Sequence, residues 1–224
     1  MRVSRTLRLA VVVVWFSLGT ALASHTLADR VKDGPGADQV RESLRCLDHG
    51  DNTDDESAKM TWYARGKALA EEGLAKNERS ADANFAYFAN WGRMMQTEGW
   101  FKNVPNLGAL QRYLDRALEL DPRHAGALAA KGGLYRQLPR LLGGSSEKAE
   151  TYLTRAIAAD PLAVGARLEL AECYLASDRE AEARDLSTTA LRLAREQGKV
   201  RFARRAEELL GRMGDPIAQR SNPD

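Results

Sequence analysis

The feature that most constrains this fold is a two-helix pattern that recurs along the chain. In its clearest copy, residues 128–135 follow the spacing Leu-x3-Gly-x2-Tyr, and residues 149–156 follow Ala-x3-Leu-x2-Ala. Each spacing puts large and small residues on one face of an α-helix, which lets two helices approach closely. Pro161, five residues after the second pattern, prevents that helix from continuing. The stretch therefore predicts two antiparallel helices joined by a turn.

The pattern recurs before and after this copy. The Asp-Pro pairs at 121–122 and 160–161 are 39 residues apart, and residues 114–117 and 153–156 precede them with the same Leu-x2-Ala spacing. Further matches downstream are Tyr174, Ala183 and Ala190. Together these units resemble the tetratricopeptide repeat, a helix-turn-helix unit of about 34 residues. The resemblance implies a solenoid in which each unit packs on its neighbours.

Helical periodicity extends the same architecture over most of the chain. The predicted helices are residues 37–48, 56–76, 80–98, 106–120, 124–138, 146–159, 163–176, 179–195 and 199–213. The sequence thus predicts an all-α, tetratricopeptide-like helical-hairpin solenoid of about four hairpins plus a C-terminal capping helix. This domain spans residues 37–213, between a flexible lead-in at 24–36 and a disordered tail at 214–224.

The first 23 residues have the organisation of a secretory signal. Arg2, Arg5 and Arg8 precede an apolar stretch at 9–22, and residues 21–23 form a small-x-small cleavage signature. The apolar stretch is short for a membrane-spanning helix, which needs about 20 apolar residues. We therefore expect a cleaved signal peptide, with an uncleaved anchor as the alternative. The mature protein is expected to be exported into a bacterial periplasm, to be soluble there, and to have no stable membrane insertion.

Composition and motifs exclude several classes of function. Three of the 33 basic residues lie in the predicted signal, so the remainder nearly balances the 31 acidic residues, which argues against nucleic-acid or membrane binding. The sequence holds no nucleophile-elbow, phosphate-loop, dinucleotide or zinc-protease motif, so we predict no enzyme, cofactor or metal site. Cys46 and Cys173 lie about three repeats apart and are predicted to be free, buried thiols.

The candidate binding surface is the concave side of the solenoid. The first helix of each pair lines that side, and aligning the helices on Gly92, Gly132 and Ala171 superimposes three inner stripes. The candidate groove residues are Arg93, Gln96, Arg136, Leu168, Glu172 and Leu175. Small residues between them leave space, and the two arginines could hold a carboxylate or an acidic segment. The alternative is that these side chains pack on one another or point into water.

Two apolar insertions lengthen the turns of successive hairpins, at residues 98–105 and 138–144. They carry Trp100, Phe101, Leu141 and Leu142. Both emerge on the same edge of a solenoid. They either pack together as a satellite core or shape a ligand opening or a docking edge.

The second insertion supports a narrower resemblance. Pro-Arg-Leu-Leu-Gly-Gly at residues 139–144, after Tyr135 and before Lys148-Ala149, resembles the T-component family of TRAP transporters. That family implies a periplasmic helical-repeat fold with a pocket or channel, oligomerisation in some members, and a periplasmic substrate-binding protein as partner.

Two functional hypotheses follow from the sequence. The first is an exported, non-enzymatic scaffold that binds a protein partner through its concave groove. The second is a TRAP-transporter-associated accessory protein that holds a small apolar or carboxylate ligand near the two insertions. Both allow an oligomer.

Overall fold

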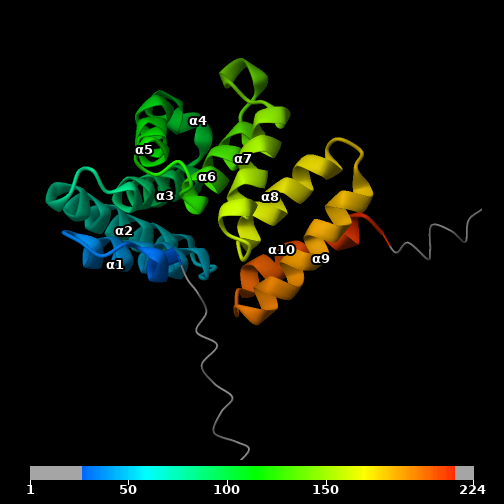
Figure 1. Cartoon of the computed structure of the whole chain (residues 1–224), viewed down its shortest axis with the longest axis horizontal. Helices are drawn as coiled ribbons and strands as arrows, with labels where there is room; N and C mark the ends of the chain where they lie inside the picture. Colours follow the sequence, from blue (N-terminus) through cyan, green and yellow to red (C-terminus); the bar gives the residue numbers. More distant parts are fainter. Residues whose placement is uncertain (1–26, 215–224) are drawn as a thin grey trace, which may run out of the picture.

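The described part of the chain, residues 27–214 of a computed structural model, folds entirely into helices and connecting turns (Figure 1). The α-helices are α1 (Ala37–Asp51), α2 (Glu56–Lys76), α3 (Ala81–Glu98), α4 (Trp100–Asn103), α5 (Leu107–Leu120), α6 (Ala125–Gln137), α7 (Ser146–Ala159), α8 (Val164–Leu175), α9 (Glu180–Glu196) and α10 (Val200–Arg212). The 3-10 helices are η1 (Leu27–Arg30), η2 (Val104–Asn106) and η3 (Arg140–Leu142). The all-α fold class predicted from the sequence is confirmed. The predicted signal at 1–23 and nearly all of the predicted tail lie outside the described residues.

Side-chain caps explain why several helices begin where they do. Asp55 accepts a hydrogen bond from the backbone N–H of Ala58 at 2.6 Å and starts α2. Ser80 does the same for α3, and Ser145 does so for α7. Each of these side chains satisfies one of the N–H groups that a helix leaves unpaired at its start.

The helices pair along the chain as α1 with α2, α3 with α5, α6 with α7, and α8 with α9, and α10 then packs on α9. Successive pairs turn around an arc, so that α10 comes back toward α1 (Figure 1). The first helices of the pairs lie on the inside of this arc. Within residues 27–214, no helix combines the length and apolar character needed to cross a membrane.

Small residues hold the paired helices close together, as the repeat pattern predicts. A Cβ atom placed on Gly132 would lie 2.5 Å from Cγ of Leu153 and 3.1 Å from the backbone oxygen of Ala149. Ala149 and Leu153 are fully buried. The interface between α6 and α7 therefore depends on glycine at this position.

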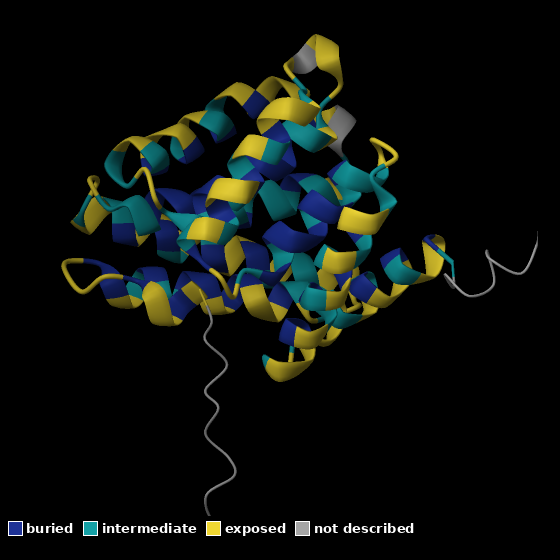
Figure 2. Ribbon diagram, turned by 45° about the vertical axis from the view of Figure 1, so that its right-hand side comes forward, coloured by how far each residue is buried: buried dark blue, intermediate teal, exposed yellow. Residues whose placement is uncertain are grey.

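Buried side chains lie where neighbouring helices face one another, and exposed ones lie on the outer faces (Figure 2). Cys46 and Cys173 are among the buried residues and are both free, which confirms the prediction of two unbridged thiols. Burial raises the pKa of the Cys173 thiol to about 11.

The segment before α1, for which the sequence predicts a flexible lead-in, contacts the hairpins. Residues 27–33 lie across the ends of the hairpins, where Arg30 pairs with Asp160 at 2.6 Å and Lys32 pairs with Asp121 at 3.0 Å. Two of the apolar side chains in this segment are buried in the core. The acids of the recurring Asp-Pro pairs are thus partners for the segment, a role that repeat spacing alone does not reveal.

Candidate functional site

The concave side of the arc encloses a cavity of about 350 Å³. Its wall is built by the inner helices α1, α3, α6 and α8, together with α10 and the segment that precedes α1. The apolar wall residues include Leu44, Phe85, Phe88, Leu134 and Phe202. Helices from both ends of the described chain therefore line the same space.

Small residues on the inner helices create this space. On α6, Gly126, Ala129 and Gly133 recur at helical spacing and all line the cavity. The ring of Phe85 packs over Gly126, where an added Cβ would lie 2.7 Å from the ring. At Gly133 the nearest atom would be 3.6 Å away, which is ordinary contact distance. Glycine thus admits an aromatic ring at one end of α6 and leaves room for a ligand at the other.

A first group of polar side chains, the Asp51 cluster, joins the two ends of the described part of the chain. Its members are Asp51, Tyr63, Arg93 and Arg201. Arg93 Nε lies 2.9 Å from Asp51 Oδ1, and Arg201 Nη1 lies 3.2 Å from the same oxygen. The hydroxyl of Tyr63 donates to it at 2.9 Å. Asp51 on α1 thereby connects α2, α3 and α10.

The Asp51 cluster is partly shielded from water. The side chain of Asp51 is 13% exposed. Burial, and then the neighbouring Asp51 carboxylate, raise the pKa of Tyr63 above its ordinary value. The phenol therefore remains a hydrogen-bond donor to Asp51 throughout the physiological range.

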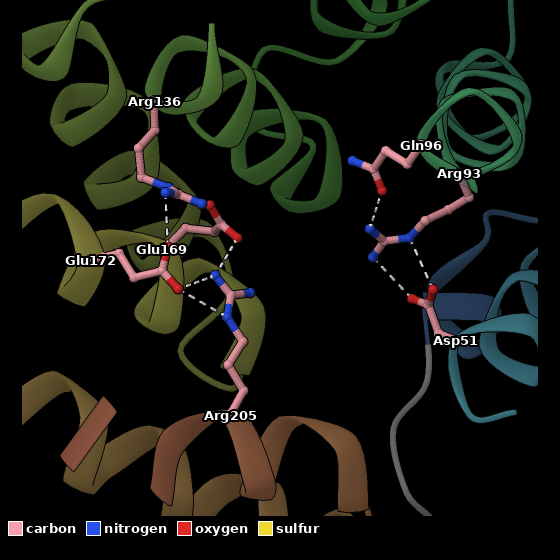
Figure 3. Close-up of polar contacts among 7 residues, drawn as sticks. All are labelled: Asp51, Arg93, Gln96, Arg136, Glu169, Glu172 and Arg205. Atoms are coloured by element: carbon pink, nitrogen blue, oxygen red, sulfur yellow. Dashed lines mark hydrogen bonds and ion pairs between the residues drawn. The ribbon is translucent and has the colours of Figure 1, made fainter. Parts of the chain in front are cut away.

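A second group, the Glu169 cluster, consists of Arg136, Glu169, Glu172 and Arg205. Arg136 pairs with Glu169 at 2.7 Å and with Glu172 at 2.8 Å, and Arg205 pairs with both acids at 2.7 Å. Burial opposes the ionisation of Glu169, but Arg205 and Arg136 outweigh it and hold the pKa of that carboxyl below its ordinary value. Figure 3 shows this cluster and the Asp51–Arg93–Gln96 group on opposite sides of the space between the inner helices.

The structure brings part of the predicted groove together. Arg93 and Gln96 line the cavity, and Arg93 donates to Oε1 of Gln96 at 2.9 Å. Arg136 and Glu172 meet in the Glu169 cluster. The arginines, which the sequence offers to an external carboxylate, already hold Asp51, Glu169 and Glu172. Their partners come from neighbouring inner helices, and a stripe read along one helix does not show them.

Leu168 and Leu175 do not belong to the cavity wall. Leu168 is fully buried, and Leu175 packs half-buried against the same core between α8, α9 and α10. Gly165, at the start of the predicted inner stripe of α8, does line the cavity, and farther along the helix Glu169 lines it in place of Leu168.

The first insertion forms α4 and η2. The amide of Asn103, which is buried, donates to the backbone oxygen of Gly99 and to Glu98 at 3.2 Å each. These bonds hold the insertion against the C-terminal end of α3. The side chains of Trp100, Phe101 and Leu142 lie outside the described part of the structure.

The second insertion forms η3, and its glycines have a structural role. Gly143 has a φ of 92°, and a Cβ on Gly144 would lie 1.8 Å from the backbone oxygen of Leu138. Leu141 is 98% exposed, so this side chain is not part of a satellite core. The conformation of this turn therefore requires the Gly-Gly pair.

Several residues on the inner face of α10 are missed by the sequence analysis because this helix reads as a simple terminal cap, and one of them, Phe202, lines the cavity. Arg201, Phe202 and Arg205 share one face of α10 and point to the inside of the arc through their contacts with Asp51, Gly165 and Glu169. Two arginines one turn apart beside a phenylalanine are the signal that could have indicated this. Among residues 27–214, no group of three or more His, Cys, Asp or Glu side chains is placed to hold a metal ion.

Comparison with solved structures gives the same architecture. A crystal structure of a thermophilic tetratricopeptide-repeat protein from Thermus thermophilus matches with a TM-score of 0.52 and 22% identity, covering 78% of this chain and 89% of that chain. Residues 143–201 also match a tetratricopeptide-repeat family model. The chain has the tetratricopeptide-repeat fold.

The N-terminal part of this tetratricopeptide-repeat chain is similar to a different group. Residues 39–141 match the family model described as Regulator of microtubule dynamics protein 1-3. Regulator of microtubule dynamics protein 3 of Mus musculus is 32% identical over 75 residues, 34% of this chain and 16% of that protein. The protein of the same name from Rattus norvegicus is 31% identical over 70 residues, 31% of this chain and 15% of that protein. The chain thus spans about a sixth of these relatives.

Proposed function

We propose that the protein is a non-enzymatic binding scaffold whose cavity receives an apolar group of a protein partner. The observation that carries this proposal is the cavity of about 350 Å³ on the concave face, with phenylalanine and leucine in its wall. Interfaces draw most of their binding free energy from a few apolar anchors that fill such pockets. The Asp51 and Glu169 clusters supply a polar surround that orients the partner.

A second candidate is a binding protein for a small ligand. The volume of the cavity lies at the lower end of the range for small-molecule sites, about 300–1,000 Å³. Helices from both ends of the described chain line it, which encloses a ligand more fully than an open groove does. In this candidate the ligand occupies the concave cavity, whereas the sequence hypothesis places it at the insertions.

Export, a periplasmic location and work beside a TRAP-transporter substrate-binding protein remain part of the second candidate. They are supported by the signal-like residues 1–23 and by the loop at residues 139–144. A substrate-binding protein would be the partner in that setting.

Site-specific photo-crosslinking tests the main proposal. A photoreactive phenylalanine replaces Gln96 or Gln137, which both line the cavity. The matched control carries it at Ala75, an exposed position on the outer helix α2. Arginine substitutions are unsuitable probes, because removing Arg93 or Arg136 takes one of the ion-pair partners from partly buried carboxylates and perturbs the clusters themselves.

The proposal predicts that both cavity positions crosslink to the same partner in cell extract and that position 75 does not. Competition by excess unlabelled protein should remove the crosslink. Equal capture from position 75, or no protein partner at either cavity position, would contradict it. In the latter case a small molecule that co-purifies with the protein would favour the second candidate.

A further inference from the structure

Most charged side chains that line the cavity already have a partner of opposite charge. The pairs are Arg30 with Asp160, Arg45 with Glu42, Arg93 with Asp51, and Glu169 with Arg136 and Arg205. Two lining charges differ from these. Within residues 27–214 the half-buried ammonium of Lys199 and the exposed carboxylate of Asp48 make no direct ion pair, although the two opposite charges attract each other at longer range.

These two charges come from opposite ends of the described chain and lie next to apolar walls of the cavity. Lys199 immediately precedes α10, three residues before Phe202. Asp48 lies on α1, four residues after Leu44. Leu44 and Asp48 share one face of α1, and all four residues line the cavity. Each charge is therefore next to an apolar surface of the same space.

We propose that the cavity binds a free α-amino acid with an apolar side chain, whose carboxylate pairs with Lys199 and whose ammonium pairs with Asp48. This inference rests on the cavity being the binding site, and it names the ligand class of the second candidate function. A ligand with a carboxylate alone would be repelled by the carboxylate of Asp48. A ligand with an amine alone would be repelled by the ammonium of Lys199. A group that carries both charges satisfies both residues.

The surroundings of Lys199 support this assignment. Burial lowers the pKa of Lys199, while the carboxylates of Asp48 and Asp160 act in the opposite direction and Arg30 adds to the lowering. Asp160 is already paired with Arg30. The ammonium is thus partly removed from water without a direct partner, which is costly. A ligand carboxylate would supply that partner.

Calorimetric titration of the purified full chain tests the inference. The probe is L-phenylalanine, and the analogues each lack one feature of the ligand. 3-Phenylpropanoate lacks the ammonium, 2-phenylethylamine lacks the carboxylate, and glycine lacks the apolar side chain. We expect L-phenylalanine to bind and each analogue to bind at least about tenfold more weakly.

Two neutralising variants identify the residues responsible. Lys199→Gln and Asp48→Asn should each weaken binding of L-phenylalanine at least about tenfold. The matched controls Lys76→Gln and Asp185→Asn change exposed charges outside the cavity lining and should leave binding unchanged. Thermal unfolding of each variant verifies that it folds, and the analogue series on the unaltered protein gives an answer even where a variant does not.

Three results would overturn the inference: no binding of L-phenylalanine, equally tight binding of 3-phenylpropanoate or 2-phenylethylamine, or unchanged binding by both neutralising variants. Equally tight binding of an analogue would leave the cavity standing as a binding site for another ligand. Failure of the proposed function is distinguished from this, because it is measured by crosslinking from Gln96 and Gln137.

Discussion

Single glycines set the distance between paired helices. Gly132→Ala puts a Cβ 2.5 Å from Leu153 Cγ, so one helix must move although alanine favours helix formation. We predict a loss of about 1–3 kcal/mol in the free energy of unfolding, as for other overpacked cores. Chemical denaturation measures it.

Gly108→Ala is the matched control for this substitution. Gly108 also lies in a helix, α5, but a Cβ there would meet nothing within 4 Å. Alanine should be neutral or stabilising by up to about 1 kcal/mol at this position. Equal destabilisation by the two substitutions would show that close approach is not the role of Gly132.

Spacing identifies the residues that pack inside one hairpin, such as Gly132 and Ala149, because their partners are in the next helix of the same unit. It does not identify partners across units. Arg93 and Arg136 read as free binding groups, since their carboxylates belong to α1 and α8. Whether an inward-facing charge has a partner of opposite charge becomes clear only when all the inner helices are placed together.

At the scale of elements, α10 does more than cover the end of the solenoid. Through Arg205 it pairs with Glu169 and Glu172 of α8, which also hold Arg136 of α6. The element predicted as a cap thus forms one wall of the cavity. The amphipathic pattern of α10 predicts that one face is covered by other helices. It does not show that another face, with polar side chains, is turned to the inside of the arc.

The Glu169 cluster predicts a specific pH dependence. The pKa of Glu169 lies below its ordinary value of 4.5, so the folded state favours the ionised form. Its contribution to stability is fully present above pH 4.5 and is lost as the pH falls through the folded-state pKa. Glu169→Gln should therefore destabilise the protein at neutral pH, and the difference from the unaltered protein should shrink in acid.

Denaturation curves between neutral and acidic pH measure this effect. Glu72→Gln, at an exposed site on α2, is the control and should give a difference that does not change with pH. A pH-independent loss of stability in Glu169→Gln would instead mean that its packing, and not its charge, matters.

At the scale of the whole molecule, the arc is closed by contacts between its two ends. Arg201 and Asp51 are 150 positions apart and meet at 3.2 Å. The side chain of Arg201 is 52% exposed, so this pair contributes little to global stability. Arg201→Ala should leave the unfolding midpoint nearly unchanged while increasing amide hydrogen exchange in α1 and α10.

Arg192→Ala is the control for Arg201→Ala. Arg192 pairs with Glu196 within α9, and its side chain is 60% exposed. Its loss should leave exchange in α1 and α10 unchanged. The same exchange pattern in both variants would mean that the closing contact does not restrain the ends.

The repeat pattern predicts the order, class and approximate bounds of the helices, because those depend on neighbouring residues. The curvature of the arc accumulates over all repeats from small rotations between successive pairs. The meeting of Arg201 with Asp51, and the contact of Arg30 with Asp160, arise only from that accumulated curvature. An open groove was therefore the natural expectation from sequence, and a cavity lined by both ends was not.

The central claim is that this cavity is the binding site, and filling it is the most direct test. Ala129→Trp places a large side chain on the cavity wall, and Ala75→Trp makes the same change on the exposed outer face. Binding of whichever occupant the cavity takes, a protein partner measured by crosslinking or a small ligand measured by titration, should be lost with Ala129→Trp and retained with Ala75→Trp. Full binding by a folded Ala129→Trp protein would contradict the claim.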